Sequence, residues 1–158
     1  MAVEKAAVVP GLELLYASRF DVGAAIDVGA TPRGLRRMVP ITGGAFEGPK
    51  LSGVVLPGGE DWQLIRSDGV VEVDARYVLQ TTSGARIHVR NHGLLSASRE
   101  VLIALGTGTY PSPDAYYFRT QARFECGHAD FAWLHRLTAI ASAEVRRGHV
   151  LITVYAVT

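Results

Sequence analysis

The amino-acid sequence predicts an all-β protein, a single antiparallel β-barrel of about eight or nine strands with one short helix. Two observations carry this prediction. The 17 glycines exceed the usual share of a 158-residue chain, and they separate short apolar runs at fairly regular spacing. In VEVDARYVL (residues 71–79), apolar and charged residues alternate, which is typical of a strand with two different faces. Closing the sheet removes exposed strand edges, and a β-sandwich is the alternative.

The expected elements follow from these apolar runs and from the turn signals between them. Signals such as Pro57-Gly58-Gly59, Asp68-Gly69 and Ser83-Gly84 supply the backbone angles that turns require. One helix is expected where Ser98 could cap SREVLIAL, with Gly106 ending it. Residues 22–40 look like an irregular crossing loop. Strands are expected at 12–20, 41–46, 51–56, 62–66, 71–81, 85–94, 117–124, 133–145 and 150–157.

Composition limits the class of protein and its partners. A content of 48% hydrophobic and 20% charged residues is globular, and the length suits one domain over residues 1–158. A formal net charge of +1 gives no basic surface for nucleic acid or membrane, so neither partner is expected. Cys126 is the single cysteine, which rules out an intrachain disulfide. The N-terminus lacks the pattern of a signal peptide and no window is a membrane helix, so we expect a cytoplasmic protein.

Nine segments between about residue 41 and residue 157 match one known protein family in order: GGAFEGP (43–49), LPGGEDW (56–62), RSDG (66–69), DARYVL (74–79), HVRN (88–91), YYFRT (116–120), RFE (123–125), WLH (133–135) and VYAV (154–157). On these segments the chain resembles the DUF3237 (UPF0311) family of uncharacterised proteins. The resemblance implies a single β-barrel, similar to allene oxide cyclase and dirigent-like barrels, which steer cyclisation or coupling of small organic molecules without a metal. The family pattern has asparagine after its tryptophan-leucine pair, whereas this chain has His135.

The stretch FECGHADFAWLH (124–135) gathers groups that could form a metal site, a thiol nucleophile with its base, or the lip of a pocket. Its C-x-H-x-D-x4-H spacing matches no zinc pattern, so no metal is expected. A lone cysteine is most often a small buried hydrophobe, which disfavours Cys126 as a nucleophile. The stretch is therefore interpreted as a pocket lip in which Glu125 and His135 matter.

Charged residues inside the expected strands allow two interpretations. By alternation alone, one face of each strand meets water and is charged for that reason. Several of these charges lie within the family motifs, however, and charges on several strands of a barrel would also build a polar lumen. The resemblance favours the lumen, which would place Arg76, Arg90, Arg119 and Glu125 inside the barrel.

These observations favour a small-molecule enzyme of the lyase or isomerase kind, cyclase-like in type, working by acid–base chemistry without a cofactor. Asp61, Glu125 and His135 are the catalytic candidates. The candidates for binding an acidic or phenolic substrate are Trp62, Arg76, Arg90, Arg119 and Trp133. A non-catalytic binding barrel, a carrier or sensor, would need the same arginines and aromatic residues. Apolar outer faces would favour self-association into a homo-oligomer.

Overall fold

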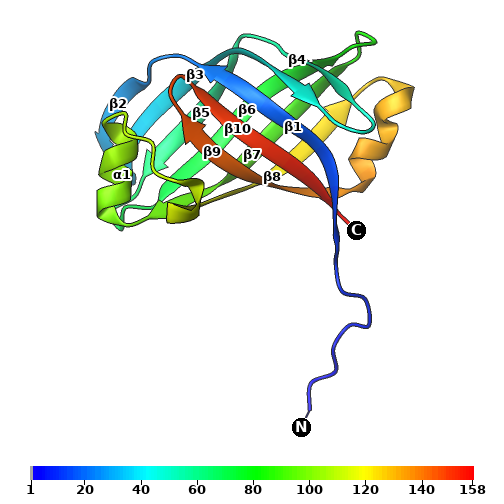
Figure 1. Cartoon of the computed structure of the whole chain (residues 1–158), viewed down its shortest axis with the longest axis horizontal. Helices are drawn as coiled ribbons and strands as arrows, with labels where there is room; N and C mark the ends of the chain where they lie inside the picture. Colours follow the sequence, from blue (N-terminus) through cyan, green and yellow to red (C-terminus); the bar gives the residue numbers. More distant parts are fainter. Residues whose placement is uncertain (1) are drawn as a thin grey trace.

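Strand pairing in the computed structural model, which describes residues 2–158, closes one antiparallel sheet on itself (Figure 1). The helical segments are α1 (Arg99–Gly106) and the short 3-10 helices η1 (Pro113–Ala115) and η2 (Ala129–Arg136). The strands are β1 (Leu12–Val22), β2 (Ile26–Thr31), β3 (Gly34–Glu47), β4 (Ser52–Val55), β5 (Gly59–Ile65), β6 (Val71–Thr81), β7 (Arg86–Ala97), β8 (Tyr116–Cys126), β9 (Thr138–Arg146) and β10 (His149–Val157).

The barrel closes through β3. Around the barrel the strands follow the order β1, β10, β9, β8, β7, β6. Next to β6 lie β4 and β5, each of which pairs with β6 on one side and with β3 on the other. Pairing of β3 with β1 then completes the barrel. The result is an eight-stranded barrel with two extra strands, which confirms the predicted fold class. Gly44 allows the closing contact, because any Cβ there would collide with the backbone carbonyl of Arg19 on β1.

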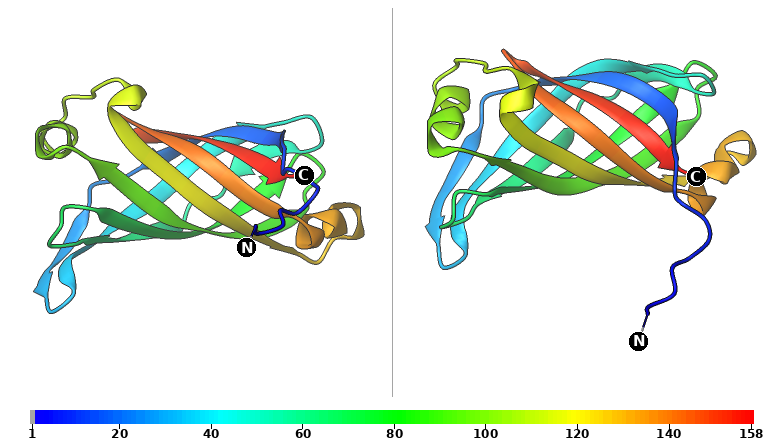
Figure 2. Two further views of the ribbon diagram at one scale, coloured as in Figure 1. Left: turned by 90° about the horizontal axis from the view of Figure 1, so that it is seen from below. Right: turned by 60° about the horizontal axis from the view of Figure 1, so that its bottom comes forward.

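The prediction of an irregular loop at residues 22–40 is wrong. The segment contains β2 and the first part of β3, joined by a tight turn at Pro32 and Arg33 into a hairpin. Two features of the sequence hide this hairpin. Its pairing shifts register between Asp27 and Gly29, and arginines interrupt the apolar residues of β3. In Figure 2 the hairpin extends past the barrel at the end where α1 lies.

The expected strand at residues 133–145 begins too early. Residues Ala129–Arg136 form η2, and β9 starts at Thr138. His128 caps η2 with its side chain, whose Nδ1 accepts a hydrogen bond from the Asp130 amide at 3.2 Å. Leu134 on η2 is 1% exposed and packs into the core, so η2 covers one end of the barrel (Figure 2). Burial of Leu134 thus overrides the strand-like alternation of this segment.

The predicted helix is confirmed at the opposite end of the barrel. Ser98 Oγ accepts a hydrogen bond from the Val101 amide at 3.3 Å, and the helix ends at Gly106. Apolar residues of α1, among them Leu102 and Leu105, pack against a small core cluster that contains Val71 and Phe118. Within the described part of the chain, no helix is long and apolar enough to cross a membrane.

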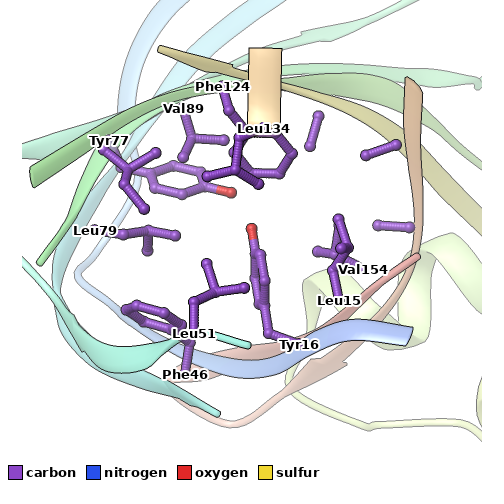
Figure 3. Close-up of a cluster of buried hydrophobic side chains, with 14 of the residues drawn as sticks. Leu15, Tyr16, Phe46, Leu51, Tyr77, Leu79, Val89, Phe124, Leu134 and Val154 are labelled. Atoms are coloured by element: carbon purple, nitrogen blue, oxygen red, sulfur yellow. The ribbon is translucent and has the colours of Figure 1, made fainter. Parts of the chain in front are cut away.

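Most of the core lies between these two ends, inside the barrel (Figure 3). Every second residue of β8 from Tyr116 to Cys126 is buried and the residues between are exposed, and β1, β6 and β7 keep the same alternation over much of their length. The larger cluster contains two tyrosines, Tyr16 and Tyr77, surrounded by aliphatic and phenylalanine side chains. The interior of the barrel is therefore mainly apolar, with a few polar groups.

Removing the side chain that η2 inserts into the core should destabilise the barrel. We expect Leu134→Ala to lower the free energy of unfolding by about 2–5 kcal/mol, the usual range for a buried leucine. Urea unfolding followed by circular dichroism measures this change. Leu12→Ala is the matched control: Leu12 is 59% exposed, and its truncation should change stability by about 0.5 kcal/mol or less. Equal effects of the two substitutions would contradict the packing of η2 into the barrel.

Candidate functional site

Two tyrosine hydroxyls face each other in the middle of the barrel (Figure 3). Tyr16 comes from β1 and Tyr77 from β6, and their side chains are 0% and 3% exposed. Edge-on contacts with Phe46 and Phe20 hold the two rings, at centroid distances of 5.5 Å and 4.6 Å. Among residues 2–158, neither hydroxyl forms a hydrogen bond of normal length and angle, although each tyrosine is close enough to the other to affect its pKa, and Asn91 is close enough to affect that of Tyr77. Two buried donors thus point into the barrel close to each other, without a well-formed hydrogen bond.

Two further polar groups of the lining share this property. Asn91 on β7 is 3% exposed and lies between the small residues Ala75 and Ala122 of the neighbouring strands. Its Oδ1 has no hydrogen-bond partner within the described chain, and neither has Oγ1 of the buried Thr120. A buried polar atom left unpaired costs about 1–3 kcal/mol, so four of them in one interior need an explanation beyond stability.

Asp61 contributes a carboxyl group to the same interior. It lies on β5 opposite Ala75, whose side chain packs against the larger core cluster. Gln63 Nε2 donates to Asp61 Oδ2 at 2.7 Å, and Arg37 Nε in turn donates to Gln63 Oε1 at 2.7 Å. The Asp74 amide donates to Asp61 Oδ1 at 3.1 Å. The chain Arg37–Gln63–Asp61 therefore fixes the orientation of the carboxyl group.

The electrostatics of the interior favour proton transfer near neutral pH. Burial raises the pKa of Asp61 to about 6, although its hydrogen bonds from Gln63 and Asp74 and the charge of Arg37 act in the opposite direction. Burial also raises the pKa of Tyr16 and of Tyr77, and the negative charge of Asp61 adds to the effect on Tyr77. The interior thus combines a carboxyl group that can exchange a proton with two phenols that stay neutral.

One wall of the interior is built from very small side chains. Strands β8, β9 and β10 turn a series of alanines inward, all buried. The two tyrosines come from β1, which pairs with β10 beside this wall, and from β6. Short side chains keep this wall close to the backbone and therefore away from the tyrosine hydroxyls, which lets those hydroxyls face the middle of the barrel (Figure 3). The alanines are Ala122, Ala139, Ala141 and Ala156.

The charged residues predicted to line the lumen lie on the outside of the barrel. Arg76, Arg90, Arg119 and Glu125 are all exposed, at alternate positions to the buried residues of their strands. The expectation of a lumen built from these charges is wrong, because their apolar neighbours form the core instead. Arg90 binds both carboxylate oxygens of Asp74, at 3.0 Å and 2.9 Å, on this outer surface.

The other predicted site residues are divided between three places. Asp61 is inside the barrel, whereas its neighbour Trp62 points outward and is 38% exposed. Trp133 and His135 do not share a strand face, because both lie on η2. Trp133 packs partly against the core, under Lys50 Nζ at 5.5 Å from the ring. His135 is exposed, and its Nε2 accepts a hydrogen bond from the Cys126 amide at 2.9 Å.

Sequence reasoning missed Tyr16, Tyr77, Asn91 and Thr120. Three of them could have been predicted, because they lie in segments that carry the family resemblance. Tyr77 is in DARYVL, Asn91 is in HVRN and Thr120 is in YYFRT. LPGGEDW likewise contains Asp61. The signal was the phase of the alternation: each polar interior residue falls in register with the apolar residues of its strand. Tyr16 lies outside the motifs, although it is in phase with the buried Phe20 of its own strand.

The comparisons agree with this fold and with the resemblance. A family model described as a protein of unknown function (DUF3237) matches residues 10–157. The chain belongs to the DUF3237 family. A UPF0311 protein of Rhodopseudomonas palustris is 37% identical over 150 residues, which cover 94% of this chain and 98% of that protein. A crystal structure of a conserved protein of unknown function from the same species superposes with a TM-score of 0.90, at 33% identity over 96% of this chain and 99% of that one.

One sequence match and one solved structure, both from Penicillium herquei, extend the DUF3237 comparison. A hydroalkoxylation enzyme of Penicillium herquei is 32% identical over 80 residues, which cover 51% of this chain and 53% of that enzyme. The crystal structure of an enzyme from Penicillium herquei has a TM-score of 0.75 at 20% identity, covering 99% of this chain and 100% of that one. At that identity the structural likeness concerns the fold alone.

Because the interior hydroxyls are unpaired, removing one should not destabilise this DUF3237 protein. We expect Tyr77→Phe to leave the free energy of unfolding unchanged or to raise it by about 1 kcal/mol. Tyr116→Phe is the matched control, since the Tyr116 hydroxyl accepts a hydrogen bond from the Val145 amide at 3.0 Å, and it should lose about 1 kcal/mol. Urea unfolding measures both. A loss above about 2 kcal/mol in Tyr77→Phe would mean that this hydroxyl is paired.

The raised pKa of Asp61 should also appear in the pH dependence of stability. The native state binds this proton more tightly than the unfolded state, where the pKa is close to 3.8. The resulting stabilisation is complete below about pH 4 and is lost as the pH rises through about 6, by about 3 kcal/mol in total. The difference in unfolding free energy between wild type and Asp61→Asn, measured from pH 4 to 8, isolates this contribution. A difference that does not change with pH would contradict the burial of the carboxyl group.

Proposed function

We propose that this DUF3237 protein is an enzyme of the lyase or isomerase kind that uses acid–base chemistry on a small organic molecule inside the barrel. The substrate class is a hydroxylated, acidic or phenolic compound with an apolar skeleton. The observation that carries the proposal is a proton-exchanging carboxyl group, Asp61, on the inner face of the barrel, near enough for its charge to raise the pKa of Tyr77, which faces Tyr16 in an apolar interior. Sites for small molecules usually combine apolar walls with a few convergent polar groups.

The unpaired groups of the interior support this proposal. Stability alone would favour phenylalanine or an aliphatic residue at Tyr16 and Tyr77, because their hydroxyls are buried without partners. A substrate that carries oxygen atoms could accept hydrogen bonds from both hydroxyls. Asn91 adds an amide to the same lining. Buried, preoriented donors of this kind stabilise negative charge that develops on a substrate oxygen.

The named activity of one relative gives the proposal a reaction type. In hydroalkoxylation the oxygen of an alcohol adds to one carbon of a double bond and a hydrogen adds to the other carbon. A base must therefore take the hydroxyl proton, and an acid must protonate carbon. A single carboxyl group with a pKa near the ambient pH can do both in turn. Asp61, with a pKa of about 6, has this property.

The steps assigned to the side chains are as follows. The Asp61 carboxylate takes the proton of a substrate hydroxyl, and the oxygen attacks the β-carbon of a conjugated carbonyl group. The electrons of the carbon–carbon double bond shift toward the carbonyl carbon, and those of the C=O bond move onto its oxygen, which gives an enolate. The hydroxyls of Tyr16 and Tyr77 donate hydrogen bonds to the enolate oxygen. Protonated Asp61 then returns the proton to the α-carbon. The product is an isomer of the substrate, and Asp61 ends as it began.

Glu125, His135 and the outward arginines have no part in these steps, since they lie outside the barrel interior. Glu125 therefore provides a matched control for Asp61, because the same carboxyl-to-amide change can be made on the outer face of β8. The chain Arg37–Gln63 acts on the reaction indirectly, by orienting the Asp61 carboxyl group.

A thermal-shift screen against hydroxylated enones, phenols and small carboxylates, followed by mass spectrometry and NMR of the products, tests the proposal. Compounds that bind the native barrel should raise its melting temperature. At least one should be converted to an isomer of equal mass, with a rate that rises with pH through about 6. Asp61→Asn should slow turnover by about a hundredfold or more, and Glu125→Gln should leave it unchanged.

Two results would contradict the proposal. Turnover in Asp61→Asn at the wild-type rate would remove Asp61 from the reaction. Compounds that bind in the barrel without any conversion would instead identify the protein as a carrier or sensor.

A further inference from the structure

A second site lies on the opposite face of the sheet from Asp61. The outer surface of β5–β9, together with the tip of the β2–β3 hairpin, forms a groove of about 770 Å³. Its lining includes Trp62, Tyr117 and four arginines. Because consecutive strand residues point to opposite faces, Trp62 belongs to this groove while Asp61 belongs to the interior.

Three of the four arginines in the groove are not neutralised by a carboxylate. Arg33, Arg36 and Arg119 take part in none of the ion pairs formed among residues 2–158. Arg119 donates only to the backbone carbonyl of Phe118, at 3.0 Å. Arg90, in contrast, is held by both oxygens of Asp74. Two carboxylates, Glu72 and Asp74, also line the groove, but they pair with Arg66 and Arg90. The groove therefore presents net positive charge and free guanidinium donors.

Aromatic side chains lie beside these cations. Tyr117 is 54% exposed, and the Arg119 guanidinium lies 5.3 Å from the centre of its ring. Trp62 is 38% exposed, and its Nε1 donates to Glu60 at 2.8 Å, which fixes the orientation of the indole ring. Leu94 on β7 adds an aliphatic side chain that is 40% exposed. Large apolar groups left exposed around a hollow are typical of a binding surface.

From this arrangement we infer that the groove binds a small organic anion that carries an aromatic ring. Guanidinium groups from the hairpin and from β8 would bind its carboxylate, for which a planar, permanently charged fork is suited. Trp62 and Tyr117 would pack against its ring. The site is separate from the proposed active site, because its side chains are on the outer face of the barrel and Asp61 is on the inner face.

Phenylacetate and its neutral amide, phenylacetamide, are suitable probes. Isothermal titration should detect saturable binding of phenylacetate with a dissociation constant of about 1 mM or lower. In the Trp133→Phe variant, where Trp62 is the single tryptophan, the same titration should change the fluorescence with the same midpoint. Phenylacetamide should bind at least about tenfold more weakly, because it lacks the charge that the arginines recognise.

Arginine variants give the decisive comparison. Arg36→Gln and Arg119→Gln should each weaken phenylacetate binding by about tenfold. Arg86→Gln is the matched control, since Arg86 is exposed at the start of β7 and does not line the groove, and it should bind as wild type does. Unchanged binding in both groove variants would overturn the inference. So would a dimer, detected by sedimentation, that shields Trp62 from an aqueous quencher, because the groove would then be an interface between copies.

Discussion

The alternation of strand residues between two faces in a closed barrel is the constraint on which the rest of the structure depends. Each residue of β5 to β8 must point either into the barrel or away from it, and its neighbours in sequence must point the other way. Asp61 and Trp62 show the consequence, because two adjacent residues serve two different surfaces. The same separation sends Tyr77 inward and Arg76 outward on β6. The close contact at Gly44 fixes the register in which the barrel closes. A slip of one residue would turn the charged residues inward and the core residues outward.

The barrel interior contains polar groups that lower the stability of the fold and that the proposed reaction uses. Aliphatic and phenylalanine side chains fill most of it, and η2 and α1 pack against its two ends. Within this apolar surrounding the protein keeps two phenols, an amide and a carboxyl group, most of them without partners. The same desolvation that makes these groups costly also raises the pKa of Asp61 toward neutrality. Burial is thus the physical cause of both the energetic cost and the proposed reactivity.

Sequence patterns predicted the fold class and the capped helix, and they selected Asp61, which the structure places on the inner face of the barrel. They did not predict which face of each strand is inside. In YYFRTQARFEC the buried positions carry Thr120 among aromatic and small residues, and the charges occupy the other face. Alternation alone favoured this arrangement, whereas the family resemblance directed attention to the charges. The β2–β3 hairpin and η2 were missed because register shifts and the burial of a single leucine, Leu134, are tertiary effects with no local signature.

A crystal structure with a compound from the thermal-shift screen would test the central claim, that the polar groups of the barrel interior form the binding site, most directly. The account predicts electron density between the tyrosine rings, with a ligand oxygen within hydrogen-bond distance of the hydroxyl of Tyr16 or Tyr77 and another polar group of the ligand at the Asp61 carboxyl. A ligand bound only on the outer surface, with Tyr16 and Tyr77 hydrogen-bonded to each other across a filled interior, would contradict it.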